Sequence, residues 1–365
     1  MLSSLTLKNF KPFENQSFSL KPLTLLAGLN STGKSSLLQS LLLLRQSSQQ
    51  NLLDNVGLAL NGDLVSIGTA KDALCKRAKE DSITFEIFMN NNIKGTWVFN
   101  YDSQSDVMQI SSLSNADVEI YNSSLFTDKF HYLKAERIAP RNYFQMSDFQ
   151  VKQHQQIGSQ GEFTAHFLSI NEFTKIPHNQ LSHELIKSDN LRNQVEAWLG
   201  EISPGTRVDI ELHSAMDLVN LQYSYEDNNS YRSTNVGFGI TYTLPIIVAI
   251  LSATSDTLIL LENPEAHLHP RGQSKMGELI ALAANCGIQI ILETHSDHVL
   301  NGIRKAVRHK KLDAEKVQIN YFERYLKKGQ PTTEIITPRI YQSGGIDKWP
   351  DGFFDQAEKD LMDLL

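Results

Sequence analysis

Residues 28–35 read Gly28-Leu-Asn-Ser-Thr-Gly-Lys-Ser35, which fits the pattern GxxxxGK followed by Ser or Thr. Glycines let such a loop curl until successive N–H groups point at one anion. The lysine supplies a positive charge for the β- and γ-phosphates of a nucleotide, and the last hydroxyl is a Mg²⁺ ligand. The loop follows an apolar run, Leu23–Ala27, and precedes a helical pattern from Ser35 to about Gln46. This context predicts a nucleotide-binding loop formed by Asn30, Ser31, Thr32, Gly33, Lys34, Ser35 and Ser36.

A second apolar run, Thr257–Leu261, precedes Glu262-Asn-Pro-Glu265. A P-loop ATPase needs an acidic residue at the end of a neighbouring strand to hold Mg²⁺ with its water shell. We therefore predict that the nucleotide is ATP and that Ser35 and Glu262 hold Mg²⁺; a helix-capping role for Glu262 is the alternative. His295 follows the next buried run, Ile288–Leu292, where a histidine can contact the γ-phosphate or the attacking water.

Composition and charge exclude several classes of protein. The 34 Lys and Arg residues and 41 Asp and Glu residues give a formal net charge of −7. This balance excludes a histone-like or arm-type nucleic-acid binder. Two cysteines, Cys75 and Cys286, cannot form a disulfide framework and fit a reducing compartment. With no signal-peptide pattern and no apolar run of ~18 residues, we expect a cytoplasmic protein with no membrane segment.

The two ends of the chain show clearer patterns than its middle. Alternation of Leu5, Leu7 and Phe10 with polar residues predicts a strand, and Glu14–Gln16 predicts a turn. Further elements are expected as follows: strands over Ile83–Phe88 and Thr96–Tyr101, polar loops over Ser103–Asn115 and Glu226–Arg232, one or two helices within Leu181–Leu199, and helices over Tyr242–Ser252, Gln273–Asn285 and His298–Arg308. Alternating strands and helices towards the C-terminus indicate a parallel α/β sheet.

Together these segments resemble the ABC-type ATPase heads of the RecF, SMC and OLD families. Residues 28–35 are similar to the Walker A motif of that group, and Leu258–Glu262 to its Walker B motif. Leu7-Lys-Asn-Phe-Lys-Pro-Phe13 is similar to its N-terminal strand motif. The resemblance implies an α/β P-loop NTPase of ABC-ATPase type, with a mixed central sheet flanked by helices. We expect one head over residues 1–365, with a compact inserted lobe over residues 76–230.

Three further segments carry the resemblance. His267–Pro270 falls at the D-loop, His295 at the switch histidine, and Asn235–Thr241 at the signature motif. In that group the signature turn reaches the γ-phosphate bound to a second copy. The resemblance therefore implies a homodimer, or a larger even-numbered oligomer, that sandwiches ATP. The residues expected to contact nucleotide in this way are Gly237, Gly239, Thr241 and His269.

The likeness extends to a subgroup of stand-alone prokaryotic AAA-type ATPases that carry ENPEAHLHPRGQ, as here at Glu262–Gln273, and a tail like Ile346–Gln356. Tyr132–Tyr143 and Ile157–Glu162 are also similar to that subgroup. Relatives of this kind, such as PtuA-like and OLD-like ATPases, occur in anti-phage defence systems and act with a nuclease. The resemblance implies a separate effector protein, because residues 296–365 are too few for an appended nuclease.

Two departures from the group's pattern matter. Asn263 occupies the position of the usual catalytic glutamate, and an amide cannot accept a proton from water. Either Glu265 takes over, or hydrolysis is slow and the protein acts as an ATP-gated clamp. The second departure is length: residues 36–236 contain no heptads, so no long coiled coil is expected.

Three alternatives remain open from the sequence. The protein is an ATPase, an ATP-bound scaffold or sensor without useful turnover, or a RecF-like DNA-repair ATPase.

Nucleic acid could contact a basic cluster formed by Arg304, Lys305, Arg308, His309, Lys310, Lys311, Lys327 and Lys328, although a solvated helix face is the simpler explanation. Lys134, Arg137 and Arg141 form a smaller cluster that could touch nucleotide or a partner. Two histidines, His267 and His269, are too few ligands for a metal site.

Overall fold

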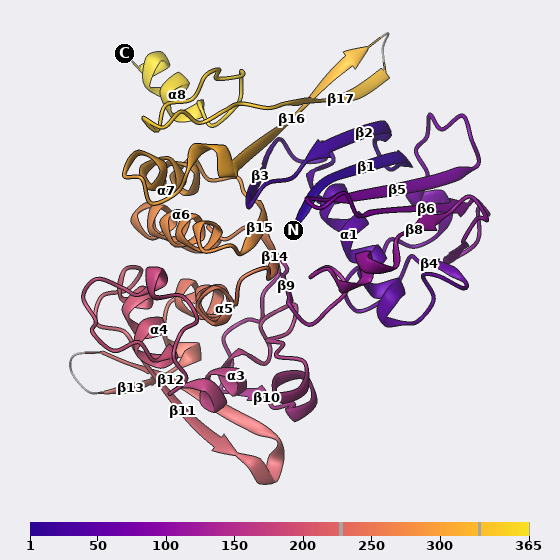
Figure 1. Cartoon of the computed structure of the whole chain (residues 1–365). Helices are drawn as coiled ribbons and strands as arrows, with labels where there is room; N and C mark the ends of the chain where they lie inside the picture. Colours follow the sequence, from indigo (N-terminus) through magenta and orange to yellow (C-terminus); the bar gives the residue numbers. More distant parts are fainter. Residues whose placement is uncertain (226–228, 328–329, 365) are drawn as a thin grey trace. The chain divides into compact units, whose positions relative to one another are not determined.

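The computed structural model describes residues 1–225, 229–327 and 330–364; Lys328 and Glu226–Asn228, which fall within the predicted basic cluster and polar loop, lie outside them. The chain divides into two compact units. Figure 1 labels their helices and strands. The first unit comprises Met1–Thr127, Val317–Arg339 and Lys348–Leu365, and the second comprises Asp128–Lys316 and Ile340–Asp347. The division after Thr127 falls inside residues 76–230, the stretch that we predicted as an inserted lobe.

An antiparallel sheet of order β2-β1-β5-β6-β8 forms one part of the first unit. The predicted alternation holds in its strand β1, where Leu5, Leu7 and Phe10 are fully buried. The five strands are β1 (Leu2–Phe10), β2 (Phe13–Ser19), β5 (Ser82–Met89), β6 (Lys94–Asn100) and β8 (Asn115–Ala116). Short elements beside them are β4 (Gly57–Ala59), β7 (Val107–Gln109), α2 (Ala70–Ala73) and the 3₁₀ turn Val118–Asn122.

The nucleotide-loop motif belongs to a second group of strands in the first unit. β3 (Leu23–Gly28) pairs in parallel with β16 (Val317–Lys327), which pairs antiparallel with β17 (Gln330–Ile336), so this sheet is mixed. Helix α1 (Lys34–Gln49) follows β3 after the motif. Nine leucines in β3 and α1 are completely buried: Leu23, Leu25, Leu26, Leu37, Leu38, Leu41, Leu42, Leu43 and Leu44. Burial of this strand and helix fixes both ends of the loop between them. The C-terminal helix is α8 (Gln356–Leu364).

Three parallel strands carry the acidic motif in the second unit. β14 (Leu258–Glu262) lies between β15 (Gln289–Glu293) and β9 (Phe130–Leu133). The register pairs Glu262 with Glu293 and Leu261 with Leu133, so the C-terminal ends of all three strands lie at one edge. Ligand sites of open parallel sheets lie at this edge.

Helices and a smaller sheet complete the second unit. The helices are α3 (Thr164–Asn171), α4 (Leu191–Gly200), α5 (Phe238–Ser252), α6 (Pro270–Asn285) and α7 (Asp297–Arg308). Strands β10 (Tyr143–Gln145), β12 (Leu218–Ser224) and β11 (Arg207–His213) form an antiparallel sheet, with β13 (Ser230–Arg232) paired to β12. Single helical turns cover Phe149–Gln153, Asn179–Leu181, Ser214–Met216, Ser233–Asn235 and Ala314–Lys316. Within the described residues, none of the helices has the length and apolar character that crossing a membrane requires.

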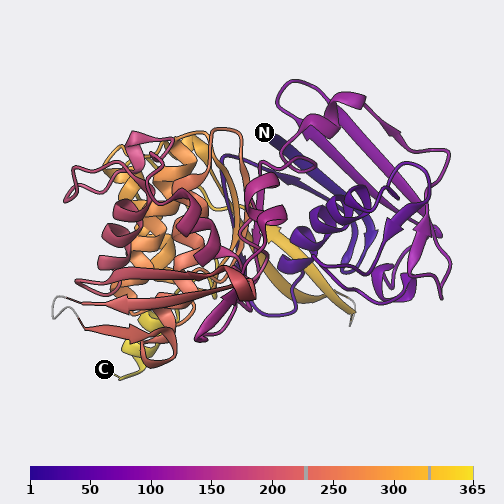
Figure 2. The same cartoon turned by 90° about the horizontal axis from the view of Figure 1, so that it is seen from below.

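Helices α6 and α7 run side by side (Figure 1 and Figure 2), and glycines set their spacing. A Cβ on Gly277 would lie 2.2 Å from the carbonyl oxygen of Val299. A Cβ on Gly302 would lie 2.1 Å from the carbonyl oxygen of Ser274. Real Cβ atoms do not approach backbone oxygens this closely, so the two backbones touch only because both positions lack a side chain.

Several boundaries differ from the prediction. Glu14–Gln16 is not a turn but part of β2, because Asn15 and Gln16 pair with Lys8 and Leu7 of β1. The predicted polar loop Ser103–Asn115 contains β7, which pairs with β4. Within Leu181–Leu199 only one α-helix forms, and it begins at Leu191 because the Asn190 side chain caps it through the N–H of Asn193.

Candidate functional site

The predicted nucleotide loop has the backbone curvature that its sequence requires. The φ angles of Gly28, Ser31 and Gly33 are 134°, 62° and 107°, all on the left-handed side. A Cβ on Gly28 would lie 2.2 Å from the carbonyl oxygen of Phe322, and one on Gly33 would lie 2.7 Å from Cγ of Pro12. Both glycines are therefore needed for conformation and for space. Pro12 belongs to the N-terminal motif, so that motif packs directly against the loop.

Lys34 places a buried cation at the start of helix α1. Its side chain is 3% exposed, and Nζ donates to the carbonyl oxygens of Gly28 at 2.9 Å and Leu29 at 2.8 Å. The Thr32 hydroxyl also donates to the Leu29 oxygen, at 2.8 Å. These bonds hold the loop around the ammonium group. The helix dipole adds to the attraction for an anion at this end of α1.

The other predicted loop residues divide by exposure. Asn30, Ser31 and Ser35 are exposed, whereas Thr32 and Ser36 are buried. An exposed hydroxyl at the first turn of a helix, next to a lysine and a glycine-rich backbone, fits a nucleotide triphosphate with Mg²⁺. The buried Thr32 hydroxyl is used within the loop, where it donates to the Leu29 oxygen.

A pocket of about 810 Å³ in the first unit borders Ser31 of the loop. Five cationic side chains line it, Lys11, Lys71, Lys76, Arg77 and Arg324, together with Pro12, Asp72, Leu74, Cys75 and Thr333. Its acidic residue, Asp72, accepts hydrogen bonds from the N–H and the hydroxyl of Thr69 at 3.0 Å, which lower the pKa of the carboxyl. Burial lowers the pKa of Lys11, whose ammonium donates to Oε1 of Gln39 at 2.7 Å. The pocket therefore favours an anionic ligand.

Most of this cationic lining could not be predicted from the sequence. Arg77 belongs to a short basic run, Lys76-Arg77, which was not distinguished from ordinary surface charge. Its guanidinium forms an ion pair with Glu14 at 2.7 Å and donates to the hydroxyl of Thr332 at 3.0 Å. The pairing of β16 with β17 places Arg324 opposite Thr333, far along the chain from residue 77. The basic pair Lys76-Arg77 is a weak signal for this lining, because it lies far from residues 28–35 in the sequence.

Glu262 ends β14 in the second unit, and hydrogen bonds fix its carboxylate. The Tyr132 hydroxyl donates to Oε1 at 2.9 Å, and the N–H of Ala135 donates to Oε2 at 3.1 Å. Burial and the neighbouring Glu262 carboxylate raise the pKa of Tyr132, which keeps this hydroxyl a donor. Each carboxylate oxygen thus has one donor, Tyr132 within β9 for Oε1 and Ala135 just after β9 for Oε2. This carboxylate is an oriented oxygen ligand, as a Mg²⁺ site requires.

Glu265 holds the end of β15. Its Oε2 accepts from the Thr294 hydroxyl at 2.7 Å, and its Oε1 accepts from the N–H of His295 at 2.8 Å. The His295 ring itself is exposed. Because both Glu265 oxygens are engaged, its clearest role in this structure is to fix the backbone that presents His295.

Asn263 forms the turn after β14 with φ 44°, a left-handed conformation that asparagine tolerates better than most residues. Its N–H donates to the Glu293 carbonyl oxygen at 2.9 Å. The structure therefore places Asn263 beside the ends of β14 and β15, where the resemblance places a catalytic glutamate.

The predicted signature turn lies at the N-terminus of α5. Gly237 is the N-cap of this helix, and a Cβ there would meet no atom within 4 Å. Phe238 is 51% exposed. Gly239 packs closely, since its Cβ would lie 2.6 Å from the His267 carbonyl oxygen. Thr241 is only 2% exposed, so it lies inside the unit rather than on the helix tip.

The two histidines of the predicted D-loop have separate structural roles. The His267 ring lies against the rings of Phe238 at 5.5 Å and Tyr242 at 4.8 Å. His269 caps α6, where its Nδ1 accepts from the N–H of Arg271 at 3.3 Å. Among the described residues, no place gathers three or more His, Cys, Asp or Glu side chains suited to a metal ion.

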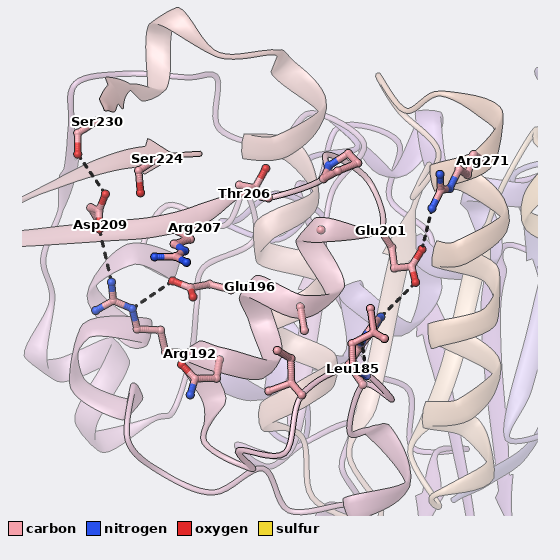
Figure 3. A pocket seen from close by; sticks show the side chains of 17 residues that line it. Leu185, Arg192, Glu196, Glu201, Thr206, Arg207, Asp209, Ser224, Ser230 and Arg271 are labelled. Carbon is pink, nitrogen blue, oxygen red and sulfur yellow. Dashed lines mark hydrogen bonds and ion pairs between the residues drawn. The ribbon is translucent and has the colours of Figure 1, made fainter. Parts of the chain in front are cut away.

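Another pocket in the second unit, of about 1030 Å³, lies between α4, β11 and the start of α6 (Figure 3). None of the predicted site residues lines it. Arg192 forms ion pairs with Glu196 at 3.3 Å and Asp209 at 3.6 Å, and Arg271 lies 3.5 Å from Glu201 (Figure 3). This pocket is lined by three arginines and three acidic residues, whereas the pocket of the first unit is lined by five cationic residues and one acidic residue.

Comparison with solved structures supports the fold. The chain is similar to an SMC head bound to the C-winged helix domain of ScpA, with 14% identity, a TM-score of 0.56 and coverage of 94% of this chain and 98% of that one. It is also similar to an SMC head domain with an extended coiled coil bound to the C-terminal domain of ScpA, derived from Pyrococcus furiosus. That match has 13% identity, a TM-score of 0.51 and coverage of 100% and 99%. No match was found among the curated proteins.

The mixed α/β fold and the glycine-rich loop before α1 define a P-loop ATPase domain of the type found in SMC heads. Residues 23–301 match the family described as "AAA domain, putative AbiEii toxin, Type IV TA system". The chain belongs to this family. Residues 312–364 match a second family, described as "Protein of unknown function (DUF3696)".

Proposed function

We propose that this protein binds ATP with Mg²⁺ at the loop Gly28–Ser35 and hydrolyses it slowly, with Glu262, Glu265 and His295 as the residues that assist hydrolysis. The observation that carries the proposal is the closed glycine loop around Lys34, with its ammonium on two loop carbonyls at the start of α1. Membership of an AAA-domain family supports ATP as the nucleotide. The cationic pocket beside Ser31 supports an anionic ligand.

Oxygen donors are available for Mg²⁺ at the predicted positions. Ser35 is an exposed hydroxyl at the first turn of α1, and Glu262 is an oriented carboxylate. These are the ligand types that Mg²⁺ prefers. Bound Mg²⁺ would neutralise phosphate charge during phosphoryl transfer. Lys34 and the loop N–H groups would hold the phosphates, and Glu262 would keep its orientation through Tyr132 and Ala135.

The first test is nucleotide binding by Lys34→Ala. A fluorescent ATP analogue titrated with Mg²⁺ should bind the wild type and lose at least ten-fold affinity in the variant, because a charge-assisted phosphate contact contributes about 1.5–3 kcal/mol. Lys79→Ala removes an exposed lysine of the same unit and should bind like the wild type. Wild-type affinity in folded Lys34→Ala would refute the assignment of this loop.

A second function from another class has its own support: an ATP-bound scaffold or sensor without useful turnover. Asn263 replaces the expected general base, and both oxygens of Glu265 are engaged by Thr294 and His295. Phosphate release separates the two functions when wild type is compared with Glu262→Gln and Asn263→Glu. Absence of Mg²⁺-dependent release from wild type would favour the scaffold. Faster release from Asn263→Glu than from wild type would support a missing base, after allowance for strain of about 1 kcal/mol at a left-handed position.

The dimer that we propose uses the signature turn. Gly237 and Phe238 stand open at the N-terminus of α5, where N–H groups and the helix dipole favour a phosphate. ATP with Mg²⁺ should therefore convert monomer to dimer, most clearly in Glu262→Gln, which would slow hydrolysis. Light scattering after size exclusion measures this. Gly237→Glu, which adds a negative charge at the turn, should stay monomeric; its dimerisation would contradict the sandwich.

We further propose that the dimer switches a separate effector, a nuclease in prokaryotic anti-phage defence. The segment Glu262–Gln273 and its likeness to defence ATPases support this role, and the family description names a toxin of a toxin–antitoxin system. Co-purification of tagged protein from cells, with and without ATP, should identify the effector. Recovery of nucleic acid rather than a nuclease would favour the RecF-like alternative, which a salt series of DNA binding would then test.

A further inference from the structure

The segment after β9 grips the turn after β14 through one buried arginine. Arg137 is 2% exposed. Its Nη1 donates to the Glu262 carbonyl oxygen at 2.8 Å and to the Lys134 oxygen at 3.0 Å, and Nη2 donates to the Asn263 oxygen at 2.7 Å. One rigid guanidinium therefore spans two consecutive carbonyl groups at the point where the acidic strand ends. Lysine, a single-point donor, cannot reproduce this geometry.

The Arg137 guanidinium also contacts helix α5. Cζ of Arg137 lies 5.4 Å from the centroid of the Tyr242 ring, a cation–π contact. Tyr242 follows the Gly237–Thr241 turn, and its ring also lies 4.8 Å from the His267 ring. Arg137 is thus packed between the start of α5 and the turn that begins at Glu262, and all of these residues belong to the second unit.

Stability alone does not explain why a charged side chain is buried here. Burial lowers the pKa of Arg137 to about 10, although Glu265, Tyr242 and Glu262 oppose this shift, and at that value the group is still charged at neutral pH. Its hydrogen bonds go to neutral carbonyl groups, and Nε has no hydrogen-bond partner among the described residues. Replacing a buried charge with a well-packed apolar side chain is often neutral or stabilising. A role in placing the strand end explains why a cation occupies this position.

We propose that Arg137 is a positioning residue that couples the Gly237–Thr241 turn to Glu262 through Tyr242 and the Glu262 and Asn263 carbonyl groups. The inference rests on the proposed function, because it concerns the acidic residue assigned to Mg²⁺ there. A shift of the α5 N-terminus on contact with a second nucleotide would move Tyr242, then Arg137, and then the backbone that carries the Glu262 carboxylate. Arg137 itself touches neither nucleotide nor metal in this proposal.

The kinetic test compares Arg137→Met and Arg137→Lys with Arg207→Met, which removes an exposed arginine of the same unit from the pocket in Figure 3. Both Arg137 variants should bind the fluorescent ATP analogue within two-fold of wild type, because the Lys34 loop is unchanged. Their kcat should fall about 10- to 100-fold, since misplacement of a catalytic group by about 1 Å has effects of this size. Millimolar guanidinium should restore part of the kcat of Arg137→Ala, which a purely structural loss would not allow. Unchanged kcat in folded Arg137→Met would overturn the proposal.

A second measurement does not depend on turnover. It therefore separates failure of the ATPase assignment from failure of the proposed coupling. Hydrogen exchange should show that ATP with Mg²⁺ protects residues 237–242 and 262–267 together in wild type. In Arg137→Met, protection of residues 237–242 should persist while that of residues 262–267 is lost. Equal protection of both segments in the variant would overturn the coupling, whether or not wild type hydrolyses ATP. Failure of wild type to bind the analogue at all would refute both this inference and the function on which it rests.

Discussion

Replacing Glu265 with glutamine tests whether this residue is a structural clamp or the general base. In the structure its two oxygens accept from the Thr294 hydroxyl and the His295 N–H. Hydrogen bonds to a charged group contribute about 1.5–3 kcal/mol each, and neutral ones about 0.5–1.5. Glutamine keeps one acceptor oxygen, and the Thr294 hydroxyl can turn to accept from its amide. We therefore expect Glu265→Gln to lower the free energy of unfolding by about 1–2 kcal/mol.

Thermal unfolding measures this loss. For a domain of 150–250 residues 1 kcal/mol shifts Tm by about 2–4 °C, so we expect a decrease of about 2–8 °C. Glu211→Gln makes the same chemical change at an exposed position of β11 and should leave Tm unchanged. Phosphate release is measured on the same samples. Wild-type Tm with a turnover loss of a hundred-fold or more in Glu265→Gln would refute the clamp and identify Glu265 as the base that replaces Asn263.

Three other predictions concern backbone and charge. Gly33→Ala should reduce ATP affinity more than ten-fold and lower the free energy of unfolding by about 1–3 kcal/mol, because φ is 107° and the new Cβ has no room. Calorimetric titration measures the affinity. Gly200→Ala, where a Cβ would meet no atom within 4 Å, is the control. Burial lowers the pKa of His166 below its usual value, so the unfolded chain binds the proton more readily and stability is lost as pH falls through about 6.5. The decrease in Tm between pH 7.5 and 5.5 should therefore be smaller in His166→Asn, and an equal decrease would contradict this. Gly302→Ala should cost about 1–3 kcal/mol in urea unfolding, because its Cβ would lie 2.1 Å from the Ser274 oxygen.

The features that could be predicted from sequence are those that a short segment of the chain determines by itself. Residues 28–35 specify their own curvature through glycine, and burial of Leu23–Ala27 identifies the strand before them. Alternating strands and helices indicated an α/β sheet, and the family resemblance implied the mixed-sheet P-loop fold, which the likeness to SMC heads confirms. Predictions from local sequence patterns were wrong where pairing with another strand determines the local structure. Glu14–Gln16 is polar enough for a turn, yet hydrogen bonds to β1 hold it in a strand.

The parts of the site that sequence did not predict depend on contacts between distant segments. Arg137 was noticed only as one member of a small basic cluster, because nothing in its neighbourhood shows that it reaches the carbonyl groups of residues 262 and 263. The cationic pocket unites Arg77 with Arg324 through the pairing of β16 and β17. Periodicity and motif spacing contain no information about such pairs, so only the folded chain reveals them.

The glycine contact between α6 and α7 has a mechanical consequence. Helix α6 begins at Pro270, directly after its N-cap His269, and α7 begins at Asp297, two residues after His295. Because Gly277 and Gly302 bring the two backbones into direct contact, neither helix can slide or roll past the other without a steric clash. We therefore expect the two helices to move as one rigid body, with both motifs at their N-terminal ends. We then expect a displacement of either motif to displace the other as well.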